Sequence, residues 1–176
     1  MSYGDPAPGS FYPFSSAIMK TMPIFIVHEH HATHLHFDFR LEMESVLKSW
    51  AIPKGPSMSS KDKRLAIMVD DHTLEYASYE GIIPEGQYGA GAVLIWDRGD
   101  YELLGGSIRE GRLEFVLHGK KLRGTFVIMK MSGKIKEWLL IKKRDEFAED
   151  DFVMKPVLNP EQQKRLKIKE PPCSAS

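Results

Sequence analysis

Short apolar runs separated by polar or glycine-containing stretches recur along most of the chain. The runs are rich in Val, Ile, Leu, Phe and Trp, and each is four to nine residues long. Runs of this length between turn signals are typical of β-strands, whereas amphipathic helices need longer segments with a period of 3.6 residues. We therefore predict strands at 24–27, 35–43, 46–52, 64–70, 92–97, 101–104, 113–119, 124–131 and 137–143.

The regular spacing of so many short strands favours a mainly β fold. Chains of this kind form an antiparallel barrel or a sandwich. Helices should be few and short, and we predict one in the acidic segment 146–152. Gly, Pro and Ser dominate residues 1–21, and prolines recur among basic residues at 155–176. We therefore expect one domain at 22–154 between an irregular N-terminal arm and a C-terminal tail.

Composition narrows the cellular setting of the protein. The chain has 24 Lys and Arg residues against 24 Asp and Glu residues, so any nucleic-acid surface must come from local clustering of charge. The single cysteine, Cys173, excludes an internal disulfide and a zinc site built from cysteines. No stretch approaches the roughly 18 consecutive apolar residues of a membrane span. We expect a cytoplasmic protein that binds no membrane.

The segment LHFDFRLE at 35–42 alternates apolar and polar residues. In a strand, His36, Asp38, Arg40 and Glu42 project to one face, and the apolar residues between them project to the other. His36 and Asp38 are then about 7 Å apart along the strand, so both side chains can reach one metal ion. This strand therefore presents a polar face that is a candidate metal site.

His30, six residues before His36, is a candidate third ligand. Two imidazoles and a carboxylate leave coordination positions open, and this set suits Mn, Fe or Zn better than Mg or Ca. Arg40 adds a planar set of donors that fits phosphate oxygens, so the metal and the arginine together indicate an anionic substrate. The alternative is a solvated, histidine-rich strand surface. Three neighbouring histidines are expected at the surface or in support of the ligands: His28, His31 and His34.

Further candidates lie beyond this strand. His72 is a possible phosphate-binding donor or general acid, and Tyr76 a hydroxyl donor to the same oxygens, with Arg64 eight residues before His72. A structural role is the alternative for each. The glycines of PEGQYGAGAV at 84–93 lack the Lys-Ser/Thr ending of a phosphate-binding P-loop, so this segment predicts a turn.

A second enzyme class also fits part of this pattern. His36 and Asp38, together with a distant His72 or His118, imitate the two-histidine, one-carboxylate site of non-haem iron oxygenases. Such an enzyme would bind Fe²⁺ and a co-substrate such as 2-oxoglutarate. An oxygenase therefore stays open as an alternative function.

The candidate residues lie in segments that read HATHLHFDFRLEMESVLKSWAIPKGPS, RLAIMVDDHTLEY, EGIIPEGQYGAGAVLIWDRG and EWLLIKKRDEFA. Together these segments, over about residues 24–148, closely resemble the 3′-phosphoesterase domain of bacterial DNA ligase D and its free-standing relatives. The resemblance implies a compact antiparallel β-barrel that binds Mn²⁺ and trims the 3′ ends of broken DNA in non-homologous end joining. It implies removal of a 3′-terminal ribonucleoside, which leaves a 3′-phosphate, and removal of that phosphate to give a 3′-hydroxyl.

The resemblance also assigns roles to residues of this chain. Carried onto matching positions, the family's metal ligands fall on His30, His36 and Asp38. Its phosphate-binding and catalytic side chains fall on Arg40, His72, Tyr76 and Arg64.

Two features depart from the family pattern. His28 stands where many members have Gln, and the N-terminal arm lacks the usual Arg-Asp-Phe opening. We expect a stand-alone enzyme that acts on DNA or DNA/RNA 3′ ends of primer-template type, with a separately encoded DNA ligase and polymerase as partners. A DNA-end-binding module that has lost turnover is the non-enzymatic alternative.

Overall fold

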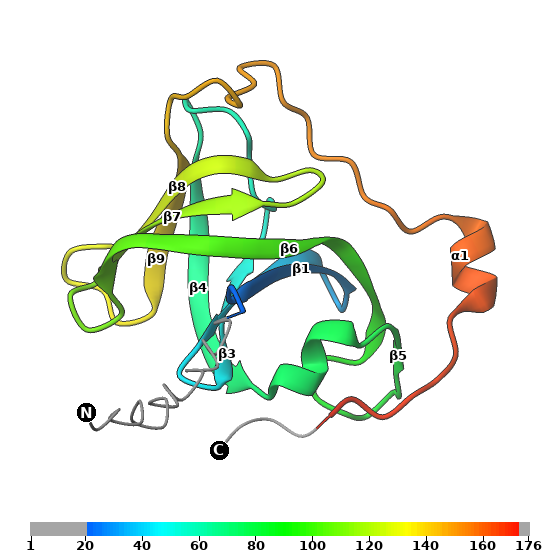
Figure 1. Cartoon of the computed structure of the whole chain (residues 1–176). Coiled ribbons are helices and arrows are strands. Elements are labelled where there is room, and N and C mark those ends of the chain that lie inside the picture. The colour runs from blue at the N-terminus through cyan, green and yellow to red at the C-terminus, as the bar shows by residue number, and fades with distance from the viewer. Residues whose placement is uncertain (1–20, 173–176) are drawn as a thin grey trace, which may run out of the picture.

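The computed structural model describes residues 21–172, and Figure 1 shows their arrangement. Apart from residue 21, the predicted N-terminal arm lies outside the described residues, as does Cys173. The described residues form nine strands and two short helices. The strands are β1 (Ile24–His31), β2 (Leu35–Met43), β3 (Val46–Ile52), β4 (Lys63–His72), β5 (Gly81–Ile83), β6 (Gly91–Ser107), β7 (Arg112–His118), β8 (Arg123–Lys130) and β9 (Glu137–Lys142). The helices are the 3₁₀ helix η1 (Leu74–Ser78) and the α-helix α1 (Pro160–Arg165).

Eight of the described strands close into an antiparallel barrel. They follow the order β1-β2-β3-β4-β9-β8-β7-β6, and pairing of β6 with β1 completes the ring. β5 pairs with β6 outside this ring. Closure leaves no open edge in the ring, which is the usual advantage of a barrel over an open sheet. The predicted barrel is confirmed (Figure 1).

Residues 92–97 and 101–104, predicted as two strands, belong to the single strand β6. This strand pairs with β1 and β5 in its first part and with β7 in its second. Gly99, which resembles a turn signal in the sequence, lies where two backbones approach closely, because a Cβ there would stand 2.1 Å from the carbonyl oxygen of His118. Glycine therefore permits this close approach of two backbones at a position within β6 and does not end the strand.

The barrel interior is filled by aromatic and aliphatic side chains. Phe37, Phe39 and Leu41 of β2 are buried in it. Phe115 stacks between Phe39 and Phe126, with ring centroids 5.9 Å and 6.3 Å apart. Burial of each such side chain contributes about 1.5–3 kcal/mol. The predicted apolar face of β2 thus forms part of the core, and its polar face must lie on the outside of the barrel.

A second apolar cluster covers part of that outer surface. Ile26 and Val93 project outward from the barrel and pack with Tyr76 and Tyr79 from η1 and the residue after it, and with Ile83 of β5. These contacts hold η1 and β5 against β1 (Figure 1). Sequence patterning predicted neither element, because each is too short to show a period.

Residues 146–152 form successive turns instead of the predicted helix. The Asp145 carboxylate accepts a hydrogen bond from the backbone N–H of Phe147 at 2.9 Å. The backbone N–H of Glu149 donates to the carbonyl of Met58 at 2.8 Å, rather than to the carbonyl four residues earlier. A side-chain acceptor and a distant carbonyl therefore take the hydrogen bonds that a helix would need.

Residues 155–172, here called the C-terminal strap, run along the outside of the barrel (Figure 1). The indole N–H of Trp96 donates to the carbonyl of Lys155 at 2.9 Å. The backbone N–H groups of Val157 and Leu158 both donate to the carboxylate of Glu29. The first part of the strap is therefore fixed to the barrel by three hydrogen bonds.

The strap then contains α1, which the sequence analysis missed although Asn159 and Pro160 signal a helix start. The Asn159 side chain accepts from the backbone N–H of Gln162 at 2.8 Å, which is the usual N-cap interaction. Beyond α1, Ile82 of β5 exchanges backbone hydrogen bonds with Lys167 and Lys169. The strap thus adds to the edge of the sheet next to β5.

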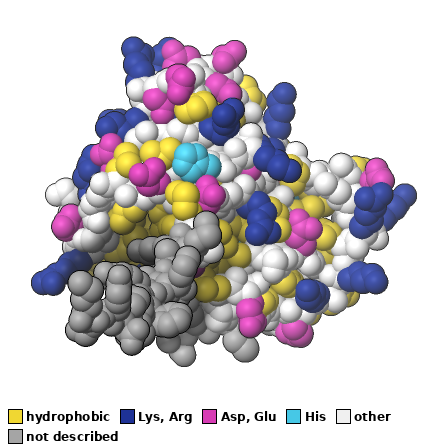
Figure 2. Space-filling view, in the orientation of Figure 1, with side chains coloured by type: hydrophobic (Ala, Val, Ile, Leu, Met, Phe, Trp, Pro, Cys, Tyr) yellow, Lys and Arg dark blue, Asp and Glu magenta, His cyan; other side chains and the backbone are white. Residues whose placement is uncertain are grey.

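Charged side chains of both signs are interspersed over the face in Figure 2, in agreement with the balanced charge of the chain. Within residues 21–172, neither helix has the length and apolar character of a membrane span. Attraction for an anionic ligand must therefore arise from the local arrangement of a few side chains.

Candidate metal centre

The polar face of β2 meets β1 on the outside of the barrel. His30 of β1 lies directly opposite His36 of β2 in the antiparallel ladder, and their ring centroids are 4.7 Å apart. Asp38 is two residues further along β2, on the same face. Cross-strand pairing therefore brings the three predicted metal ligands together without any long loop.

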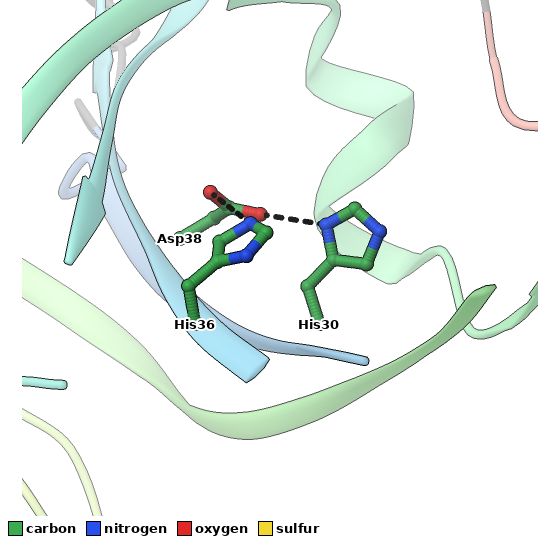
Figure 3. A group of neighbouring side chains, drawn as sticks. All are labelled: His30, His36 and Asp38. Carbon is green, nitrogen blue, oxygen red and sulfur yellow. Dashed lines mark ion pairs between the residues drawn. The ribbon is translucent and has the colours of Figure 1, made fainter. Parts of the chain in front are cut away.

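The three side chains converge on one point (Figure 3). His30 Nδ1 lies 3.4 Å from Asp38 Oδ2, and His36 Nε2 lies 3.4 Å from Asp38 Oδ1. One ligand atom from each residue falls within 4.8 Å of the other two. Among the described residues, this is the one group of His, Cys, Asp and Glu side chains with such convergence.

Backbone carbonyls orient both imidazole rings. His30 Nε2 lies 2.5 Å from the carbonyl of Gly89, and His36 Nδ1 lies 3.1 Å from the carbonyl of His34. Because a carbonyl only accepts, each of these nitrogens carries the ring proton in the neutral imidazole. The lone pairs of His30 Nδ1 and His36 Nε2 then face Asp38, as they do in metal sites where an outer partner fixes the tautomer.

The electrostatics favour an ionised carboxylate between these rings. Burial alone would raise the pKa of Asp38, but the charge of Arg40, followed by the close contacts of His30 and His36, holds that pKa well below its usual range. For His36, burial acts to lower the pKa, but the hydrogen bond and charge of Asp38 raise it overall. A carboxylate facing two imidazole nitrogens thus attracts a cation, and the donor set fits Mn, Fe or Zn.

Arg40 is held in a single orientation next to this cluster. The side chain is almost wholly buried, and its Nε–H donates to His28 Nδ1 at 3.1 Å. One terminal nitrogen donates to Ser49 Oγ at 2.9 Å and lies 3.0 Å from His72 Nδ1. The other terminal nitrogen lies 3.4 Å from Asp38 Oδ2. These contacts place a fixed positive charge beside the candidate metal position.

His28 supports Arg40 rather than the metal. Its Nδ1 accepts from Arg40, so its Nε2 carries the proton and donates to the carbonyl of Tyr79 at 3.1 Å. Burial, followed by the charge of Arg40, lowers the pKa of His28 well below its usual value. A buried neutral histidine with both nitrogens engaged is suited to orienting the guanidinium.

His72 and Tyr76 complete the polar side of the site. Burial and the charge of Arg40 lower the pKa of His72 to about 4, so the ring is neutral near pH 7. Burial raises the pKa of Tyr76 to about 12, so its hydroxyl stays protonated. The two rings lie 4.5 Å apart, and Arg40 stacks over Tyr76 at 4.7 Å. Both residues offer neutral donors beside a fixed cation.

Five of the site residues line one cavity of about 310 Å³, and His28 and His36 are not part of its lining. Its walls include His30, Asp38, Arg40, His72 and Tyr76, which the sequence predicts as site residues. Sequence reasoning missed the rest of the lining, although the glycines of the 84–93 segment correctly marked a turn there. The missed lining residues are Val69, Asp70, Ile83, Gln87, Tyr88, Gly89, Pro171 and Pro172.

Arg64 is not among the residues that line this cavity. Its guanidinium pairs with Asp62 at 3.3 Å and lines a separate cavity with Lys54 and Lys63. Along β4, Arg64 shares the strand parity of Ala66, which packs into the barrel core. A catalytic role for Arg64 stays a prediction.

The remaining histidines of the 28–36 segment have structural contacts. His31 Nε2 donates to the Glu29 carboxylate at 2.6 Å, and Glu29 in turn binds the C-terminal strap. His34 contributes its carbonyl to His36. These two histidines therefore support the barrel end and the ligand orientation.

Comparison with known proteins shows which family this chain is similar to. Residues 28–130 match a family model described as the DNA ligase D 3′-phosphoesterase domain. A multifunctional non-homologous end joining protein LigD from Pseudomonas aeruginosa is 46% identical over 126 residues, which are 69% of this chain and 15% of that protein.

Two further relatives give the same result. A LigD protein from Mycobacterium bovis is 44% identical over 117 residues, which are 65% of this chain and 15% of that protein. A LigD protein from Mycolicibacterium smegmatis is 38% identical over 131 residues, which are 69% of this chain and 17% of that protein. The chain thus matches only about 15–17% of the length of these curated relatives.

Proposed function

Because this chain belongs to the DNA ligase D 3′-phosphoesterase domain family, we propose that it is a metal-dependent phosphoesterase that processes the 3′ ends of broken DNA. It removes a 3′-terminal ribonucleoside to leave a 3′-phosphate, and it hydrolyses that phosphate to give a 3′-hydroxyl. The observation that carries this proposal is the convergence of His30, His36 and Asp38 beside Arg40, next to a cavity that His30, Asp38 and Arg40 line.

The metal in this proposal is Mn²⁺, held by His30, His36 and Asp38. When bound, it supplies Lewis-acid polarisation of a phosphoryl oxygen. Three protein ligands leave coordination positions for substrate and water, and the mixed nitrogen and oxygen set is compatible with Mn²⁺.

Arg40 binds the phosphate. A guanidinium has five N–H donors, and the contacts of Arg40 with His28, Ser49, His72 and Asp38 engage at most four of them. At least one N–H of the terminal nitrogen that faces Asp38 therefore remains for a phosphate oxygen. Because the group is already fixed, little conformational entropy is lost when the substrate binds, and the charge is in place as negative charge develops.

His72 and Tyr76 hold the remaining oxygens as neutral donors. The Tyr76 hydroxyl stays protonated, so it donates a hydrogen bond without adding charge. His72 is neutral near pH 7. In the tautomer whose Nδ1 accepts from Arg40, the ring proton is on Nε2, which donates to a phosphate oxygen. Hydrolysis of a 3′-phosphate then breaks the P–O bond to the 3′ oxygen, which receives a proton, and releases inorganic phosphate.

The proposed substrates are DNA or DNA/RNA ends of primer-template type, and the proposed partners are a DNA ligase and a polymerase. The products are ends that a polymerase extends and a ligase seals. The oxygenase alternative took His72 or His118 as the second histidine of its metal site. In the structure, His30 instead completes the cluster with His36 and Asp38.

Product analysis on 5′-labelled primer-templates tests the proposed function. One substrate ends in a ribonucleotide and the other in a 3′-phosphate, each incubated with Mn²⁺ and then with EDTA. We expect shortening to a 3′-phosphate, release of that phosphate, and loss of both products in EDTA. Tight binding to both substrates without any product would overturn the proposed enzymatic function and favour the alternative, a DNA-end-binding module.

A further inference from the structure

Tyr88 is the most exposed aromatic residue of the described chain. Its relative exposure is 99%, and every other Phe, Trp and Tyr within residues 21–172 is buried or half-buried. Exposed apolar residues occur singly on most surfaces and need no explanation by themselves. Tyr88 differs because it lines the same cavity as Asp38, Arg40 and His72.

The backbone that carries Tyr88 is anchored on both sides. Gly89, the next residue, offers its carbonyl to His30, one of the candidate metal ligands. Gln87, the preceding residue, donates from its side chain to the Glu170 carboxylate of the C-terminal strap at 2.8 Å and 3.0 Å. The ring of Tyr88 therefore stands on a fixed support beside the site, although the ring itself is fully exposed.

We propose that Tyr88 is the stacking platform for the terminal nucleobase of the bound 3′ end. This inference rests on the proposed function, and it adds a base-binding site to the phosphate-binding residues. Tyr88, Pro171 and Pro172 line the cavity together with Arg40, and the full exposure of Tyr88 places its ring at the cavity rim. A terminal phosphate bound at Arg40 would leave its sugar and base free to extend toward this rim. These rim residues offer apolar surface for a base, whereas the polar residues around Arg40 offer charge for the phosphate.

Stacking also suits the chemistry of end processing. Every base has a π-face, so an aromatic ring binds all four without reading sequence. Such contacts contribute about 1–3 kcal/mol per base. An enzyme that repairs random breaks needs this tolerance, and base-edge hydrogen bonds would work against it.

The test compares two ends that differ only in the terminal base. Oligonucleotides carry a 3′-phosphate on either a normal terminal nucleotide or an abasic one, and their Kd is measured by fluorescence anisotropy in EDTA. We expect the wild-type protein to prefer the base-bearing end by roughly 5- to 150-fold. We expect Tyr88→Ala to lose this preference and Tyr88→Phe to keep it.

A matched control is Ile135→Ala, which removes another highly exposed apolar side chain, between β8 and β9 and outside the site; it should retain the preference. In Mn²⁺, KM for the base-bearing end should rise in Tyr88→Ala by a similar factor with little change in kcat. Equal loss of affinity for both ends in Tyr88→Ala, or no loss for either, overturns the platform while leaving the proposed function intact. Failure of the wild-type protein to bind or cleave any 3′-phosphate end would overturn both.

Discussion

Arg40 donates its Nε–H to Nδ1 of His28 across 3.1 Å, and both side chains are almost wholly buried. His28 in turn donates its Nε2–H to the carbonyl of Tyr79, so it connects the guanidinium to the backbone after η1. This contact is compatible with the Gln that the family resemblance implies at this position. Both side chains present an acceptor at one end and a donor at the other.

His28→Gln should therefore preserve the site, and His28→Ala should damage it. The alanine variant leaves the buried Arg40 Nε–H without an acceptor, which costs about 1–3 kcal/mol of unfolding free energy. We expect a lower kcat for phosphate release in the same variant, because Arg40 loses its fixed orientation. Urea unfolding and steady-state kinetics measure the two effects. If Gln and Ala behave alike, the orienting role is wrong.

Metal affinity should depend on His36 and be independent of His118. His36→Ala removes one of three ligands, and we expect Mn²⁺ to bind at least about tenfold more weakly. His118→Ala removes an exposed histidine of β7 that lies outside the cluster, so it is the matched control. Isothermal titration of the metal-free proteins with Mn²⁺ gives both Kd values. An unchanged Kd for His36→Ala would contradict the assigned ligands.

His72 should make the protein less stable in mild acid. Its folded pKa is about 4 against an ordinary value of 6.5, so between these values the unfolded chain binds a proton that the folded chain rejects. The stabilisation is complete above pH 6.5 and is lost as the pH falls toward 4. We expect His72→Gln to show a weaker decline in its urea midpoint over this range, measured in EDTA. The Cε1–H signal of His72 should titrate near pH 4 by NMR.

Glu29 should control the docking of the C-terminal strap. Its buried carboxylate accepts from the backbone of Val157 and Leu158 and from His31. Glu29→Ala leaves those donors without an acceptor, and we expect a loss of about 1–3 kcal/mol with faster hydrogen exchange at both strap amides. The control, Glu114→Ala, removes a half-buried carboxylate that pairs with Arg112 and Lys143; its strap amides should exchange as in the wild type. Unchanged exchange in Glu29→Ala would refute this anchoring.

The part of the site that lies within one strand could be predicted from the sequence. The two-residue period of β2 places His36, Asp38 and Arg40 on one face whatever the register of its neighbours. His30 is different, because its position opposite His36 depends on the register between β1 and β2. A pattern of residues does not fix that register, so the residues alone made His30 only a candidate, and the resemblance to a known family assigned it as a ligand.

The contacts made by loops and buried polar groups were beyond sequence reasoning. Nothing in the order of residues indicates that Gly89 offers its carbonyl to His30, or that Ser49 accepts from Arg40. The acidic segment 146–152 was assigned to a helix from its composition, but Asp145 and Met58 bind its backbone in turns. In each case the deciding partner is a single polar atom that no periodicity records.

One face of β2 carries the candidate metal ligands His36 and Asp38, and the opposite face packs into the barrel core. This arrangement limits insertions and deletions within β2. Substitutions alter one face at a time, because neighbouring side chains point in opposite directions. Deletion or insertion of a single residue between Leu35 and Arg40 would exchange the faces, turning phenylalanine toward the metal position and a carboxylate toward the barrel interior. Descendants of this chain can therefore vary in loop length far more freely than in the length of β2.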